Sequence, residues 1–353
     1  MPERELTSPV SLTLPGGALN PDAVGWARRP LVDTSGIGRG IGRGWGRNKR
    51  WEYWNVITPT HIMALTVSSI DYAAVSEVWV FDRATQREIG TNVSAVLGRA
   101  TLPASLEQGP SRARAKDLAI DIDEVPGGTR LRAATHRASF DVVAELPDGH
   151  ERLAVVVPWS ARRFQYTVKD VARPASGRVA FDGEIFDVPA GESWAVLDHG
   201  RGRWPYDIRW NWGAGSGISD GRVIGLQVGG KWTEGTGATE NAVLIDGRLH
   251  KIHDELTWDY DIWRWRQPWR VSGGGSRHPS SRSSTNAPAP TSESSRRAPT
   301  SASARGAARS APPRATTSRS TASSAGPKRC TTAGERMPRP HSPGGHPVRG
   351  ARS

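Results

Sequence analysis

Three of the four Asp-Gly dipeptides, each between two predicted strands, constrain the fold of this chain most strongly. They are Asp148-Gly149, Asp182-Gly183 and Asp246-Gly247, and Gly127-Gly128 separates two similar runs. A two-residue type I′ turn needs positive φ at both central positions, which Asp-Gly tolerates, so each dipeptide is a strong hairpin signal. Helical periodicity is nearly absent. We therefore predict an all-β fold of antiparallel hairpins that closes into one barrel or a pair of barrels.

The alternating runs define the strands and a division of the chain. The predicted strands are residues 51–57, 61–68, 77–82, 118–125, 129–135, 139–146, 151–157, 178–181, 184–188, 240–245 and 248–252. The predicted parts are an extended segment over 1–48, a first barrel-like half over 49–160, a second over 161–270 whose completeness is left open, and a tail over 271–353. The glycine- and arginine-rich run 36–47 is interpreted as a loop, because a dinucleotide-binding loop would need a strand before it and a helix after it.

The charge of the chain is concentrated in the tail. Of 47 Lys and Arg and 35 Asp and Glu, the tail holds 14 and 2, which leaves 33 of each sign in residues 1–270. A neutral body argues against a nucleic-acid partner. The tail has no aromatic residue, leucine or isoleucine, so we expect it to be disordered. Its Ser, Arg, Ala, Pro, Thr and Gly are also what GC-rich DNA encodes out of frame, and a frameshift near Val271 is the alternative.

Several classes of protein are disfavoured by what the sequence lacks. The first residues show no signal peptide, and no run of 18 apolar residues predicts a transmembrane helix. The single cysteine, Cys330, excludes an intramolecular disulfide framework and a cysteine-cluster metal site. We find no Walker loop or His-Glu-x-x-His motif and expect no cofactor or metal. A cytoplasmic protein is the expectation.

The stretch 198–212 is the leading candidate for a functional site. Read with strand period, it carries four large aromatic rings and one isoleucine on one face, namely Trp204, Tyr206, Trp210 and Trp212 with Ile208. The opposite face carries Arg203, Asp207, Arg209 and Asn211. Burying such a charged face is costly unless the charges are paired or used. The rings would be either hydrophobic core or the lining of a ligand site, and the charges either structural ion pairs or a charged site.

Four residues are candidates for catalysis. Asp207 lies among the arginines of this stretch, and His199 beside Asp198 is a candidate general base with its orienting carboxylate. Neighbours on a strand point to opposite faces, so that pair requires a turn at Gly200. Glu240 begins a strand after the glycine-rich segment 229–237, where it could position a ligand or satisfy loop backbone groups.

The candidate ligand-binding residues are aromatic, cationic or amide side chains in the same stretches and around residue 50. They are Lys49, Trp51, Tyr53, Trp54, Arg201, Arg203, Tyr206, Arg209, Trp210, Trp212, Trp232 and Asn241. Aromatic rings interleaved with cations suit sugars or single-stranded nucleic acid, and the neutral body disfavours the second.

Spaced motifs, several of them containing tryptophan, give the chain a family resemblance. They are Glu5-x-Thr7-x-Pro9-Val10, Gly17-x-Leu19-Asn20, Gly25-Trp26-x-Arg28-x-Pro30-Leu31, Lys49-x-Trp51-x-Tyr53-Trp54, Asp198-x-Gly200-Arg201 through Trp210-x-Trp212, and Trp232-Thr233-x-Gly235-Thr236-Gly237-x-Thr239-Glu240-Asn241-Ala242. From residue 3 to about 270 the chain resembles the family called domain of unknown function 2804, which has no established activity. The strand pattern is also similar to the double lipocalin-like barrels of carotenoid hydratase and tocopherol cyclase relatives. This resemblance implies two lipocalin-like barrels.

Three functional hypotheses remain open at this stage. The first is a binder, or a hydratase- or cyclase-like enzyme, that acts on a hydrophobic small molecule such as a lipid or isoprenoid. In the enzyme version an acid among Asp198, Asp207 and Glu240 protonates the substrate and the indole faces stabilise the resulting positive charge. The second is a carbohydrate-binding or carbohydrate-active β-protein, and the third a non-catalytic structural protein. The sequence leaves the oligomeric state open.

Overall fold

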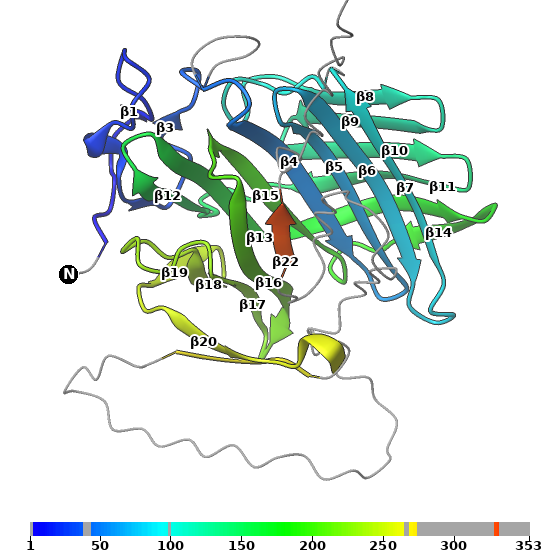
Figure 1. Ribbon diagram of the computed structural model, residues 1–353. Helices are drawn as coiled ribbons and strands as arrows, with labels where there is room; N and C mark the ends of the chain where they lie inside the picture. Colours follow the sequence, from blue (N-terminus) through cyan, green and yellow to red (C-terminus); the bar gives the residue numbers. More distant parts are fainter. Residues whose placement is uncertain (1–2, 38–43, 98–99, 265–267, 274–327, 332–353) are drawn as a thin grey trace, which may run out of the picture.

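The computed structural model describes residues 3–37, 44–97, 100–264, 268–273 and 328–331, and these form an all-β protein (Figure 1). The strands of the main sheet are β2 (Trp26–Ala27), β4 (Asn48–Ile57), β5 (His61–Ser69), β6 (Ala73–Asp82), β7 (Glu88–Val96), β8 (Ser111–Ala115), β9 (Leu118–Val125), β10 (Gly128–Thr135), β11 (Ala138–Glu145), β12 (Leu153–Ser160), β13 (Arg163–Phe181), β14 (Glu184–Val188) and β15 (Trp194–Arg203). The other strands are β1 (Val10–Ser11), β3 (Val32–Asp33), β16 (Asp207–Ser219), β17 (Arg222–Gly230), β18 (Asn241–Ile245), β19 (Arg248–Ile252), β20 (Leu256–Asp259), β21 (Arg270–Gly273) and β22 (Lys328–Thr331). Within these ranges the helical elements are two 3-10 turns, η1 (Pro21–Ala23) and η2 (Ile262–Arg264).

The main sheet forms a nearly closed antiparallel barrel. Ten of its strands follow one path, in the order β7-β6-β5-β4-β15-β13-β11-β10-β9-β8. The path curls on itself, so that β5 contacts β8 and β6 contacts both β9 and β10. In Figure 1 the blue strands β4–β7 cross over the teal strands β8–β11. The path joins strands from both predicted halves, since β4 pairs with β15, and the boundary at residue 160 stays a prediction.

The hairpin predictions are mostly confirmed. Asp182-Gly183 joins the paired strands β13 and β14, and Asp246-Gly247 joins β18 and β19, with positive φ at all four residues. The strands β9 and β10 on either side of Gly127 are also paired. The prediction of a hairpin at Asp148-Gly149 is wrong, because the strands before and after this dipeptide, β11 and β12, each pair with β13 and not with one another. Gly149 has positive φ but Asp148 does not, so the type I′ geometry is not formed.

The hairpin between β16 and β17, which was not predicted from the sequence, allows a test of the turn geometry. Its turn residues Asp220 and Gly221 have φ of 51° and 74°, and a Cβ at Gly221 would meet no atom within 4 Å. We expect Gly221→Ala to lower the free energy of unfolding by about 1 kcal/mol, purely through the backbone conformation. Gly217→Ala, in the same hairpin with equally open space but no positive φ, should be neutral or stabilising. Urea denaturation of both variants measures the difference, and equal effects would contradict the explanation.

Alternation along β13 and β15 creates two separate hydrophobic cores. On β15, Ala195 and Leu197 pack into the interior of the barrel, which we call the barrel core. Trp194 and Val196 on the other face pack into a second core, which lies between the outside of the barrel and the strands β16–β19. Because β15 is covered on both sides, successive residues along it point alternately into the barrel core and into the second core.

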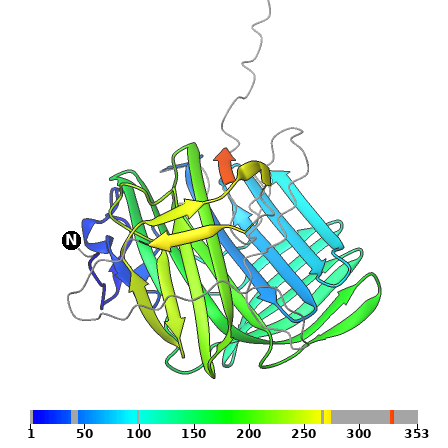
Figure 2. The ribbon, with the colours of Figure 1, turned by 90° about the horizontal axis from the view of Figure 1, so that it is seen from below.

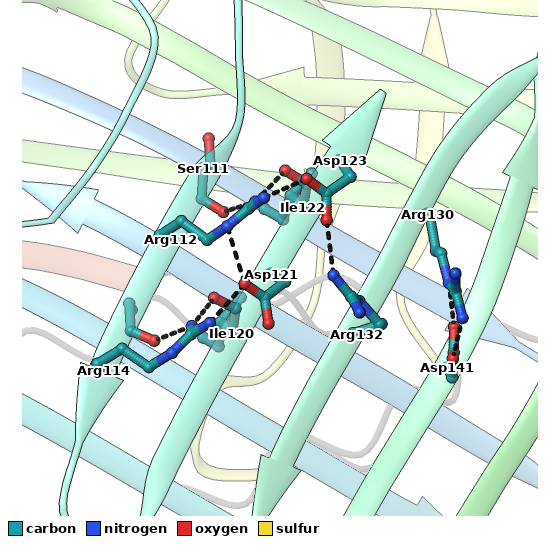
Figure 3. Close-up of polar contacts among 11 residues, drawn as sticks. Ser111, Arg112, Arg114, Ile120, Asp121, Ile122, Asp123, Arg130, Arg132 and Asp141 are labelled. Atoms are coloured by element: carbon teal, nitrogen blue, oxygen red, sulfur yellow. Dashed lines mark hydrogen bonds and ion pairs between the residues drawn. The ribbon is translucent and has the colours of Figure 1, made fainter. Parts of the chain in front are cut away.

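Charged residues cover the outer face of β8–β11 (Figure 3). Arg112 bonds Asp121 at 2.8 Å and also contacts Asp123, while Arg132 reaches Asp123 at 3.0 Å. Arg130 makes two hydrogen bonds to a third carboxylate, Asp141, at 2.8 and 2.6 Å. These cross-strand pairs are partly exposed and the charges satisfy one another, so we assign this face a solvated structural role.

The strands β16–β19 form a smaller antiparallel sheet, with β22 paired to the edge of β16. Viewed from below, the hairpin of β20 and β21 crosses this small sheet (Figure 2). A second closed barrel is not formed by the described residues, since the small sheet has two open edges, at β19 and β22. The predicted disorder of the tail concerns residues that lie mostly outside the described ranges.

Candidate functional site

Three ionisable side chains meet in the second core, and we call them the acid–lysine triad. They are Lys169 of β13, Asp198 of β15 and Glu240, which directly precedes β18. Lys169 Nζ lies 2.8 Å from Asp198 Oδ2 and 3.2 Å from Glu240 Oε2. Lys169 and Asp198 are direct cross-strand partners, so the register of the two strands sets their contact. The exposed fraction of the side chain falls from 19 % at Asp198 to 5 % at Lys169 and 1 % at Glu240.

Five tryptophans pack beside the triad, and we call them the tryptophan cluster. Trp204, which directly follows β15, is at its centre. The ring centroids of Trp51, Trp159, Trp210 and Trp232 lie 5.3, 5.8, 6.2 and 6.2 Å from that of Trp204. Trp204 and Trp232 are buried, whereas the other three indoles are half-buried. The cluster therefore reaches from the second core to the surface.

Indole N–H groups connect the tryptophan cluster to the triad. Trp51 Nε1 donates to Asp198 Oδ1 at 3.2 Å, and Trp232 Nε1 donates to Glu240 Oε1 at 2.5 Å. Hydrogen bonds from buried N–H groups hold both carboxylates in place and orient the rings that donate them. The two groups of residues thus form one site.

Trp212 and Gln227 complete the site on the side of the small sheet. Lys169 Nζ lies 5.0 Å from the centroid of the Trp212 ring, a cation–π distance. Trp212 Nε1 donates to Gln227 Oε1 at 2.7 Å, and Gln227 Nε2 donates to the backbone oxygen of Glu240 at 3.0 Å. Tyr53 packs edge-on against Trp212, with centroids 6.1 Å apart.

Two glycines make the close packing of the site possible. A Cβ at Gly200 would overlap the ring of Trp51, and a Cβ at Gly229 would overlap the carboxylate of Glu240. Neither position has positive φ, so the requirement is for space and not for backbone conformation.

The electrostatics of the site raise the pKa values of both Glu240 and Lys169. Burial raises the pKa of Glu240, and the charge of Asp198 raises it further; Lys169 and the N–H of Trp232 oppose this only in part. Burial alone would lower the pKa of Lys169, but the charges of Asp198 and Glu240 more than offset this and raise it. Glu240 is therefore suited to act as a general acid.

The structure brings together two of the four predicted catalytic residues, Asp198 and Glu240. It places His199 on the opposite face of β15, in the barrel core, with Nδ1 3.7 Å from Glu52 Oε1. The turn at Gly200 that a direct pair of His199 with Asp198 would require is absent, because β15 continues through this residue. Burial lowers the pKa of His199 to about 4, and the neighbouring cation of Arg201 lowers it as well. Asp207 lies exposed at the start of β16, away from the triad.

Five of the predicted ligand-binding residues lie in the site, namely Trp51, Tyr53, Trp210, Trp212 and Trp232. The other seven, which do not join them, are Lys49, Trp54, Arg201, Arg203, Tyr206, Arg209 and Asn241. Arg201 bonds the backbone oxygens of Trp51 and Gly200 at 2.8 and 2.9 Å from the barrel-core side. Arg203 also lies on that side, where Nε donates to Asn48 Oδ1 at 3.1 Å.

The remaining predicted ligand-binding residues either make contacts that stabilise the fold or are exposed. Trp54 is buried in the barrel core, and Lys49 Nζ lies 5.1 Å from the Tyr72 ring. Asn241 Oδ1 accepts from Gly229 N at 2.7 Å, which fixes the end of β17. Tyr206 and Arg209 are exposed. The predicted strand through 204–212 is interrupted, because β15 ends at Arg203 and β16 begins at Asp207.

Lys169, Trp159, Trp204 and Gln227 were not among the predicted site residues. Lys169 was missed because the strand containing it was predicted only from residue 178, whereas β13 begins at Arg163. The alternation of polar and apolar residues from Gln165 to Lys169 was the available signal. Trp204 was predicted to lie on the aromatic face of the stretch 198–212, but it was not predicted as a site residue.

The described residues thus define an all-β barrel protein with a buried acid–lysine triad in a tryptophan-rich second core. The chain belongs to the family described as Domain of unknown function (DUF2804), whose model matches residues 3–281. The search for characterised relatives by sequence found no match. Over the described residues there is no helix suited to spanning a membrane and no group of three or more metal-ligating side chains.

Solved structures show distant similarity to this chain. A candidate AttH protein from Nitrosomonas europaea is 15 % identical, with a TM-score of 0.39, over 69 % of this chain and 74 % of that one. Kievitone hydratase from Nectria haematococca is 10 % identical, with a TM-score of 0.42, over 68 % and 78 % of the two chains. CghA is 10 % identical, with a TM-score of 0.37, over 64 % and 68 %.

Proposed function

We propose that this protein binds a hydrophobic small molecule, such as a lipid or isoprenoid, against the tryptophan cluster and converts it by acid catalysis. The observation that carries the proposal is Glu240, an acid with a raised pKa that is 1 % exposed and hydrogen-bonded to an indole of the cluster. An acid poised in an apolar, aromatic environment suits proton transfer to a weakly basic carbon.

The proposed chemistry uses the residues as they are placed. Glu240 transfers its proton to one carbon of a substrate double bond, whose π electrons form the new C–H bond. The neighbouring carbon becomes cationic, and the faces of the indole rings stabilise that charge. Capture by water, followed by loss of a proton, completes a hydration; capture by a hydroxyl of the substrate completes a cyclisation. In this proposal the small sheet is the part of a second barrel that encloses the site.

Co-purification tests the binding step. We expect native mass spectrometry and solvent extraction of the purified protein to detect a bound hydrophobic molecule. Trp204→Leu should reduce the bound fraction about tenfold or more, because buried aromatic anchors carry much of the affinity of a site. Trp263→Leu is the matched control, since Trp263 is 90 % exposed and outside the cluster. Equal retention by Trp204→Leu and wild type would contradict the assignment, and a mass shift only with oligosaccharides would support the carbohydrate alternative.

A further inference from the structure

Glu240 is almost completely buried. Its side chain is 1 % exposed, and the side chains that contact its carboxylate are Trp232 and Lys169. The indole N–H of Trp232 is a hydrogen-bond donor that does not ionise in the usual pH range. A general acid that loses a proton in each cycle must regain one, and Lys169 is the ionisable side chain that lies 3.2 Å from its carboxylate.

Asp198 extends this contact toward the surface. Lys169 Nζ bridges Asp198 Oδ2 and Glu240 Oε2, at 2.8 and 3.2 Å. The exposed fraction rises stepwise along these contacts, from 1 % at Glu240 to 5 % at Lys169 and 19 % at Asp198. Both distances are short enough for proton transfer along a hydrogen bond.

We propose that Asp198 and Lys169 form a proton relay that returns a proton from solvent to Glu240. Asp198 takes up a proton from water at its exposed edge. The Lys169 ammonium gives one proton to the Glu240 carboxylate, and the neutral amine then takes the proton from Asp198. The net result is one proton moved from solvent to Glu240, with Asp198 and Lys169 back in their starting states. The catalytic use of this relay rests on the proposed function, whereas proton exchange at Glu240 does not.

Two further side chains act as positioning residues for the relay. Trp51 Nε1 donates to Asp198 Oδ1 at 3.2 Å, and Thr167 Oγ1, which lies 3.0 Å from the backbone oxygen of His199, is 3.4 Å from the same carboxylate oxygen. These contacts occupy one carboxylate oxygen and leave Oδ2 directed at Lys169. Gly200 contributes by leaving room for the Trp51 ring directly across from it in the register of β15 and β4.

Infrared spectroscopy of the full-length protein without ligand tests the relay. The C=O stretch of a protonated carboxyl shifts on deuteration, and the Glu240 band is identified as the one lost in Glu240→Gln. After transfer to D₂O, at an acidic pH where the Glu240 band is present in both proteins, we expect Asp198→Asn to slow the shift of this band at least about tenfold relative to wild type. Asp198→Asn keeps the size of the side chain but cannot carry a proton. Asp187→Asn, at a side chain that is 83 % exposed on β14, is the control and should exchange like wild type.

The possible results separate the relay from the proposed function. Exchange at the wild-type rate in Asp198→Asn overturns the relay, as does a wild-type protein with no protonated carboxyl band that depends on Glu240. Lys169→Met should also slow exchange, and it gives a second measurement if Asp198→Asn unfolds. Failure to find any hydrophobic ligand or product would count against the proposed function and leave slowed exchange in Asp198→Asn as evidence for the relay.

Discussion

Lys169→Met is expected to lower the free energy of unfolding by about 3–5 kcal/mol, the usual cost of removing one partner of a buried ion pair. The variant keeps most of the side-chain volume but removes the cation between Asp198 and Glu240, which contact it at 2.8 and 3.2 Å. The remaining carboxylates are then buried without a compensating charge. Urea denaturation at several pH values measures the loss.

The pH dependence of this loss has a definite sign. The raised pKa of Lys169 gives stability that is present below the pKa of an unfolded lysine, about 10.4, so it is constant between pH 5 and 8. The pKa of Glu240 is also raised, so stability falls as pH rises from the unfolded value, about 4.3, through the folded one. Without Lys169 the pKa of Glu240 rises further, and the deficit of the variant should be larger at pH 8 than at pH 5.

Two controls separate this explanation from a general loss of packing. Lys231→Met, on a loop where the side chain is 43 % exposed and pairs with Glu234, should cost little. The double variant Lys169→Met with Glu240→Gln should recover part of the stability lost in Lys169→Met at pH 8, because it removes one of the uncompensated charges. A deficit that is independent of pH, or one unchanged in the double variant, would show that the charge of Lys169 is not what matters.

Local sequence chemistry was sufficient to predict the fold class and most hairpins. Asp182-Gly183 and Asp246-Gly247 form the expected turns because the preference for positive φ is a property of the residues themselves. Asp148-Gly149 is the same dipeptide, but the strands before and after it, β11 and β12, both pair with β13. That competition between pairing partners is a tertiary effect, and the sequence around the dipeptide does not contain it.

The site was predictable in its residue types but not in its assembly. Asp198 and Glu240 were identified as acids near tryptophans, yet they come from separate sheets and meet only through Lys169. His199 could join Asp198 only through a turn at Gly200, and without that turn the two neighbours point to opposite faces of β15. Arg201 was predicted to bind a ligand. It lies two residues after His199 on the same face of β15, and therefore points into the barrel core.

Glu240→Gln is expected to lower the rate of the proposed proton-transfer reaction by about 10²–10⁴-fold while leaving the fold intact. The amide has the same shape and can still accept the Trp232 N–H bond, which is 2.5 Å long in the wild type. It has no proton to transfer to carbon. The substitution therefore removes the acid and preserves the packing against Gly229 and Trp232.

Deuterium incorporation measures this reaction even when the substrate is unidentified. The protein is incubated in D₂O with a solvent extract of lipids, and products that carry deuterium on carbon are detected by mass spectrometry. Because the pKa of Glu240 is raised, the wild-type rate should persist above the ordinary glutamate pKa of about 4.3 and fall only as pH rises through the folded value.

The comparison of variants decides whether Glu240 is the acid. Asp187→Asn, far from the site, should incorporate deuterium like wild type. Assayed at a pH low enough to keep Glu240 protonated in the variant, Asp198→Asn should be slowed in repeated turnover more than in the first turnover, since only the recharging of Glu240 through Lys169 is impaired. Glu240→Gln should be slow in both. Equal labelling by wild type and Glu240→Gln would rule out Glu240 as the acid, because the proton that reaches the substrate would then come from another group.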